Sequence, residues 1–177
     1  MEEFYPLLNN IAKVTWLFYA LSLLMFYYAS KGFASKNSDL ITLVIIVAFN
    51  ALMLGYQGIL DWYTSVNPGV SPVVHFFWYM GFAGFYLVAL IAIFRFHKKE
   101  NVRIGQLGQY TSFAFFAAGS LQLLQYAEIV LFNTDQYIDK LYTFGIPAIN
   151  TATGLICFSI ALKAAFKTHF KTEKREG

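Results

Sequence analysis

Five long apolar runs, separated by short polar segments, make up most of this sequence. They lie at about 12–30, 40–60, 73–94, 110–132 and 142–166. A helix needs about 20 apolar residues to cross the hydrocarbon core of a bilayer, and the runs are about that long. The charges lie between the runs, whereas a soluble amphipathic helix repeats them on every turn. The pattern predicts an all-α bundle of five transmembrane helices and disfavours a soluble all-α domain.

Basic residues predict the orientation of these helices. Eleven of the 13 Lys and Arg residues fall on one side of the runs, and only Lys13 and Lys140 fall on the other. Short cytosolic loops of membrane proteins carry such an excess of positive charge. We therefore expect the N-terminus outside and the C-terminus, with a basic tail at 167–177, in the cytosol. The residues on the expected cytosolic side are Lys31, Lys36, Arg95, Lys98, Lys99, Arg103, Lys163, Lys167, Lys171, Lys174 and Arg175.

Composition agrees with a membrane protein and indicates its surroundings. The chain is 58% hydrophobic, 19% aromatic and 13% charged, where soluble domains are about 25% charged. Its polar stretches are too short for a second domain, so residues 1–177 are expected to form one transmembrane domain. The net charge of +3 lies at helix ends, which favours contact with anionic lipid over binding to nucleic acid. We expect a multi-pass protein of the cell membrane, which in a bacterium is the inner membrane.

Several features limit the chemistry that this chain can perform. Cys157 is the only cysteine, so an internal disulfide or a cysteine-based metal site is excluded. The acidic start lacks the basic region of a signal peptide, and the first run is therefore expected to be retained. No nucleophile elbow, zinc-protease motif or phosphate-binding glycine loop is present. The sequence predicts no catalytic residue, no metal ligand and no particular cofactor. An intramembrane enzyme with His75 and Glu128 as acid and base is an alternative that lacks a nucleophile.

A short internal similarity suggests a duplicated hairpin. Residues 89–99 read ALIAIFRFHKK and residues 161–171 read ALKAAFKTHFK. In the expected topology both end an in–out–in hairpin, at 39–99 and 111–171. The same similarity also arises wherever a cytosolic helix end combines small, aromatic and basic residues, so the pattern leaves both explanations open.

Polar side chains within the runs gather in the expected outer half. Such side chains are costly in hydrocarbon and must face a partner, a cavity or the interface. We predict a polar, aromatic-lined pocket that opens to the exterior and binds a small ligand. Amide groups there can donate and accept hydrogen bonds, and aromatic faces suit an apolar or cationic ligand. The predicted ligand-binding residues are Tyr19, Gln57, His75, Tyr79, Gln125, Glu128 and Asn150.

Each of these polar groups also has a purely structural interpretation. Asn50 and Gln122 are favoured as hydrogen-bonding links between helices. Glu128 lies about one turn from the outer boundary and can instead extend to water. His75 is an interfacial histidine or a group that senses pH or ligand. Pro147 predicts a hinge within its helix, with a static kink as the alternative.

These observations favour a binding or sensor-like membrane protein. The alternative is an oligomeric channel or an interaction subunit, in which Gln122, Gln125 and Glu128 line a pore or contact a membrane protein partner. Small residues in the 114–119 segment suit close helix contact, either inside the bundle or between copies in a homo-oligomer. The sequence names neither the ligand nor the oligomeric state.

Overall fold

The structure, a computed structural model, describes residues 4–29, 37–67, 72–132 and 137–176, with side chains from Thr15 in the first helix up to Phe166 in the last. The described residues form helices joined by turns, which confirms the all-α prediction. The helices are α1 (Phe4–Ala29), α2 (Ser38–Val66), α3 (Pro72–Lys99), α4 (Gln106–Leu131) and α5 (Asp139–Glu176).

The described helices are consistent with a multi-pass membrane protein. Four of the described helices are long and apolar enough to cross a membrane: α2, α3, α4 and the Asp139–Phe166 part of α5. The apolar part of α1 whose side chains are described, Thr15–Ala29, is shorter. Large apolar side chains such as Leu52 and Phe113 are exposed on the outside of the bundle. Such a surface suits a lipid bilayer, because hydrocarbon rather than water then covers it. The fifth span and the orientation remain predictions.

The helices extend beyond the apolar runs. Their backbone hydrogen bonds continue into the polar residues on either side of each run. At the end of α2, the hydroxyls of Thr64 and Ser65 bond back to carbonyls of their own helix. Serine and threonine often make this bond, which takes up carbonyls near a helix end. The segment expected as a basic tail continues α5 as a helix to Glu176.

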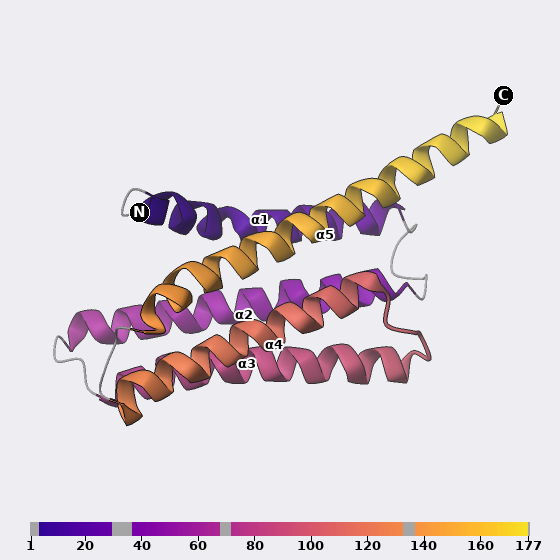
Figure 1. Cartoon of the computed structure of the whole chain (residues 1–177). Helices are drawn as coiled ribbons and strands as arrows, with labels where there is room; N and C mark the ends of the chain where they lie inside the picture. The colour runs from indigo at the N-terminus through magenta and orange to yellow at the C-terminus, as the bar shows by residue number, and fades with distance from the viewer. Residues whose placement is uncertain (1–3, 30–36, 68–71, 133–136, 177) are drawn as a thin grey trace.

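The five helices form a closed arrangement around one interior. Helix α2 contacts α1 and α3, α4 contacts α3 and α5, and α5 returns to pack along α1. Figure 1 shows α1 and α5 crossing on one side, α3 and α4 together on the other, and the end of α5 projecting beyond the bundle. We call the end with the α3–α4 turn the inner end and the end where α5 begins the outer end.

Helices α1 and α5 come closest where a glycine faces a threonine. A Cβ added at Gly154 would lie 2.7 Å from Cγ2 of Thr15, so a larger residue there forces the helices apart. Small residues at such crossings allow close backbone approach, the main source of helix association in lipid. This contact sets the spacing of α1 and α5 on both sides of the crossing.

A hydrogen-bonded cluster of Ser38, His97 and Gly105 fastens the inner end. His97 Nδ1 lies 2.7 Å from the Ile93 carbonyl oxygen, and Nε2 lies 2.9 Å from Oγ of Ser38. The Gly105 amide also donates to that Oγ, at 2.7 Å. The tight turn between His97 and Gly105 includes Asn101, whose φ of 54° is left-handed. The cluster joins the start of α2 to the end of α3 and the start of α4.

The α1–α5 crossing yields a prediction on stability. We expect Gly154→Ala to lower the free energy of unfolding in detergent by about 1–3 kcal/mol, because the added methyl group overpacks the contact with Thr15. Gly84→Ala is the matched control, since its methyl group meets open space in the middle of α3. Equal unfolding midpoints for the two variants would show that the crossing tolerates a side chain.

Candidate functional site

A pocket of about 270 Å³ lies in the outer half of the bundle, and all five helices contribute to its walls. We call it the outer pocket. Its polar lining residues are Thr15, Asn50, Gln57, Gln122 and Asn150. Its aromatic lining residues are Trp16, Tyr19, Trp78, Phe82, Tyr86 and Tyr142. The lining is completed by Met53, Leu54, Ile146 and Pro147.

The pocket forms in the outer half because the two halves of the interior are filled differently. In the inner half, aliphatic side chains interdigitate, and Leu43, Ile46, Ile93 and Leu107 are fully buried. Such side chains fill space at the density of organic crystals. In the outer half, flat rings and hydrogen-bonded amides face each other and leave a space between them.

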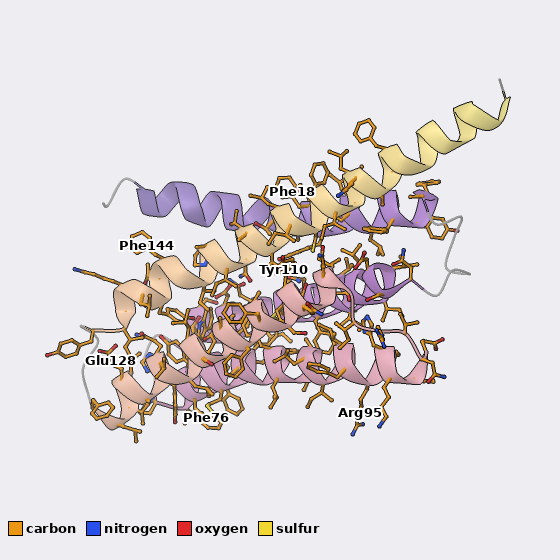
Figure 2. All side chains as sticks on the ribbon, turned by 45° about the vertical axis from the view of Figure 1, so that its right-hand side comes forward. Phe18, Phe76, Arg95, Tyr110, Glu128 and Phe144 are labelled. Atoms are coloured by element: carbon orange, nitrogen blue, oxygen red, sulfur yellow. The ribbon has the colours of Figure 1, made fainter. Side chains whose placement is uncertain are left out.

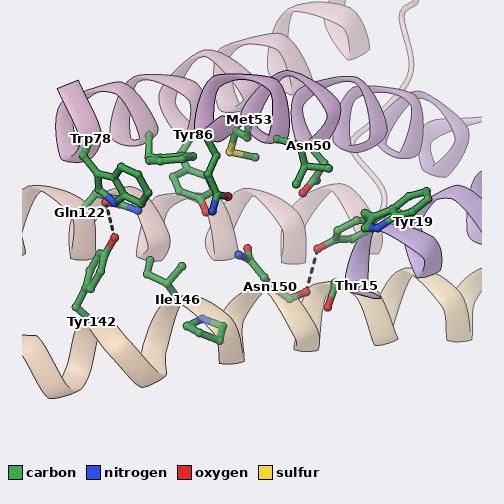
Figure 3. Close-up of a pocket in the computed structure, with 15 residues that line it drawn as sticks. Thr15, Tyr19, Asn50, Met53, Trp78, Tyr86, Gln122, Tyr142, Ile146 and Asn150 are labelled. Atoms are coloured by element: carbon green, nitrogen blue, oxygen red, sulfur yellow. Dashed lines mark hydrogen bonds between the residues drawn. The ribbon is translucent and has the colours of Figure 1, made fainter. Parts of the chain in front are cut away.

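Two polar groups stand at opposite ends of the outer pocket, as Figure 3 shows. At one end the Tyr142 hydroxyl donates to Oε1 of Gln122 at 3.1 Å. At the other end the Tyr19 hydroxyl donates to the main-chain carbonyl oxygen of Asn150 at 2.9 Å, with Asn50 nearby. We call the first the outer polar pair and the second the deep polar group. Between them lie the rings of Trp78 and Tyr86 and the side-chain amide of Asn150.

Both polar groups keep hydrogen-bonding capacity beyond the bonds they make. The Tyr142 hydroxyl engages the amide oxygen of Gln122 and leaves its NH₂ group as a donor. Asn50 donates to the Ile46 carbonyl at 2.9 Å, which leaves its own carbonyl oxygen as an acceptor. The pocket can therefore hydrogen-bond a molecule at both ends while contacting rings along its length.

A second layer of rings holds the aromatic wall in place. Phe82 packs edge-to-face with Trp78 and with Tyr56, at ring-centroid distances of 5.5 Å in both cases. Tyr86 packs against Phe115 at 5.6 Å. Edge-to-face pairs are favourable beyond the area they bury, so the wall is ordered without a ligand. A preordered wall reduces the entropy lost on binding.

Part of the predicted ligand-binding set lines the outer pocket. Tyr19, Gln57 and Asn150 do so. Tyr79 lies outside the lining, with its ring 5.5 Å from that of Tyr142, and His75 stands next to Tyr79 at 6.3 Å. His75 and Tyr79 are therefore linked to the pocket through rings. A ligand-binding role for any of these residues stays a prediction.

Glu128 binds backbone instead of facing the pocket. Its Oε1 accepts from the Tyr137 amide at 2.7 Å and its Oε2 from the Ile138 amide at 2.9 Å. These amides directly precede α5, where a carboxylate is favoured by the orphan N–H groups and by the helix dipole. Glu128 is only 3% exposed, so its side chain does not extend to water, which was the alternative interpretation from the sequence. Figure 2 shows it at the outer end, opposite Arg95.

Gln125 is also buried and lies outside the lining of the outer pocket. Its Oε1 has no hydrogen-bond partner among the described residues. With Gln122 and Glu128, it forms the polar stripe that the sequence predicts on α4, and the whole stripe faces the interior of its own bundle.

The sequence interpretation missed several residues of the site. Gln122 links α4 to α5, as expected, and also lines the pocket, while Asn50 bonds to its own helix. Tyr142 was overlooked, although its spacing of four from Ile146 and eight from Asn150 places all three on one face of α5. The sequence does not show which rings form the aromatic wall, because aromatic residues are common throughout this chain.

Pro147 faces the outer pocket, and α5 runs unbroken through it. Proline has no N–H, so the carbonyl of Thr143 lacks its usual helical donor. The hinge that Pro147 predicts is not tested by one conformation and stays a prediction.

The described residues contain no group of three or more His, Cys, Asp or Glu that could hold a metal ion. Comparisons with protein-family models, curated proteins and solved structures return no match to this chain.

Glu128 yields a second stability prediction. We expect Glu128→Gln to lower the free energy of unfolding by about 1–3 kcal/mol, since one carboxylate oxygen that accepts a buried amide is replaced by NH₂. Amide hydrogen exchange at Tyr137 and Ile138 should become faster. The exposed Asp61→Asn is the control and should change stability by less than about 0.5 kcal/mol. Unchanged exchange at both amides would contradict this capping role.

Proposed function

We propose that this protein is a sensor-like membrane protein that binds a small uncharged molecule in the outer pocket. The observation that carries the proposal is the composition of the pocket walls. They combine aromatic rings with amide groups from helices on all sides, and, within the described part of the chain, the lining includes no charged residue.

The neutral lining selects against ionic ligands. An ion buried in an apolar environment without a counter-charge is strongly unfavourable, by several kcal/mol even after relaxation. Rings alone stabilise a desolvated organic cation by about 2 kcal/mol per contact, and an anion has no partner in this lining. An uncharged molecule avoids the penalty and still uses the amides.

The two polar groups suggest the shape of the ligand. A molecule that reaches from the outer polar pair to the deep polar group needs a hydrogen-bonding atom at each end and a flat centre that packs against rings. The NH₂ group of Gln122 favours an acceptor at the outer end, and the Asn50 carbonyl favours a donor at the deep end. A volume of about 270 Å³ suits a small molecule.

The proposal includes the topology predicted from charge. Five spans with the N-terminus outside place the outer pocket toward the exterior of the cell and the projecting end of α5 in the cytosol. The basic residues then meet anionic lipid headgroups at the inner end. A protein of the cell membrane in this orientation can receive its ligand from outside.

No observation favours the channel alternative. A pore or partner surface built from the α4 stripe requires those side chains at the outside of the bundle. Gln122, Gln125 and Glu128 are each at most 3% exposed. We therefore propose ligand binding alone.

A ligand screen tests the proposal. We expect uncharged ring compounds with an acceptor at one end and a donor at the other, such as a hydroxybenzamide, to raise the melting temperature of the purified protein. A ligand at 100 times its Kd stabilises by about 2.7 kcal/mol. Carboxylate and quaternary-ammonium analogues of the same rings should have little effect, and stabilisation by these alone would contradict an uncharged ligand.

Variants localise the effect to the pocket. Ile146→Phe places a larger side chain in the outer pocket and should reduce the ligand-induced shift. Leu123→Phe adds similar bulk on the exposed face of α4 and is the matched control. Equal shifts in both variants would place any binding elsewhere.

Cysteine labelling tests the topology separately. In a Cys157→Ser background, we expect Tyr137→Cys to react with an impermeant maleimide on intact cells, and Gln106→Cys to react only after lysis. Both positions are exposed, while Cys157 itself is buried. The reverse pattern would invert the orientation and place the outer pocket toward the cytosol.

A further inference from the structure

A second hollow lies on the outside of the bundle, between α4 and α5. It has a volume of about 210 Å³, and α5 separates it from the outer pocket. On α4 it runs from Tyr110 to Ala117, and on α5 from Ile149 to Ile156. These segments place it in the half of α4 nearest the inner end. We call it the α4–α5 groove.

The groove exists because small residues line its floor. Ala114 and Ala117 on α4 face Ala152 on α5. Their neighbour Ala118, by contrast, is fully buried inside the bundle. The small residues of the 114–119 segment are therefore divided between internal packing and an open surface.

The rim of the groove favours a flexible chain over a helix. Phe113 is 74% exposed, and Tyr110 on the same side is 56% exposed. Two protruding rings prevent a second helix from lying flat against the alanines, whereas a hydrocarbon chain can pass between them. The lining of the groove is almost entirely apolar.

Charge at the inner end indicates the kind of chain. Lys163 lies seven residues after Ile156, so both are on one face of α5, about 10 Å apart along the axis. Lys163 is exposed. An acyl chain in the groove thus extends toward a lysine that can pair with its phosphate, and Tyr110 stands beside this path.

The surface that the groove presents is apolar. The Thr111 side chain lies beneath this surface and is fully buried. Across the groove, the Thr153 hydroxyl bonds to the Ile149 carbonyl of its own helix. The groove therefore suits the hydrocarbon part of a lipid.

We propose that the α4–α5 groove binds one acyl chain of an anionic phospholipid, whose phosphate pairs with Lys163. The proposal needs the bundle to lie in a membrane and is independent of the ligand of the outer pocket. It assigns a defined lipid site to one face of the molecule, beyond the general attraction of basic helix ends to anionic lipid.

Photo-crosslinking in nanodiscs tests the site. The full chain is reconstituted with phosphatidylglycerol or phosphatidylcholine that carries a diazirine in one acyl chain, and labelled peptides are mapped by mass spectrometry. We expect the phosphatidylglycerol probe to label 110–117 and 149–156 several-fold more than the exposed α3 surface around Leu87. Unlabelled phosphatidylglycerol should compete, and phosphatidylcholine should not.

Three variants separate chain from headgroup. Ala117→Phe fills the groove and should lower its labelling by both probes several-fold, with Leu87→Phe as the matched control on α3. Lys163→Gln should reduce labelling by phosphatidylglycerol about fivefold and leave phosphatidylcholine unchanged. Ala152→Leu is a second groove-filling variant in case Ala117→Phe fails to fold.

Two kinds of result would overturn the proposal. Equal labelling of the groove and the α3 surface, or equal labelling by the two probes, would show ordinary boundary lipid. A dimer in mass measurements whose groove is protected from both probes would show that a second copy of the chain occupies it. Neither result affects the ligand screen, so the two proposals fail independently.

Discussion

Hydrocarbon offers no hydrogen bonds, and this constraint organises the bundle. A polar side chain in a membrane helix has to find its partner in its own helix, in a neighbour or in a cavity. Thr15, Ser22, Gln122 and Glu128 are accordingly buried, while leucine and phenylalanine cover much of the outside. The orientation of each helix about its axis follows from which of its faces carries these groups.

Side-chain length decides how each polar group is satisfied. The short hydroxyls of Ser22, Thr42 and Thr153 bond to carbonyls of their own helices. The longer Gln122 and Glu128 reach from α4 to residues at the start of α5. Long polar side chains thus link α4 to α5 at the outer end. The space between the helices stays open there, whereas aliphatic side chains fill it in the inner half.

The two ends of the bundle are consequently built for different tasks. At the inner end, direct hydrogen bonds between Ser38, His97 and Gly105 tie three helices with no pocket between them. At the outer end, the amides of Asn50, Gln57, Gln122 and Asn150 line a cavity. Helix α5 takes part in both the pocket and the close crossing at Gly154, and it then continues out of the bundle to Glu176.

The sequence by itself determined the helices and the inward direction of their polar faces, because apolar length and spacing along a helix are local properties. Asn50 and Gln57 are seven residues apart, and this spacing puts both on the face of α2 that lines the pocket. Only the tertiary structure decided which polar groups meet. Glu128 caps α5 because the Tyr137 and Ile138 amides lie within its reach, and His97 is buried beside Ser38 at the start of another helix. Such pairings depend on the crossing of helices, which no single segment encodes.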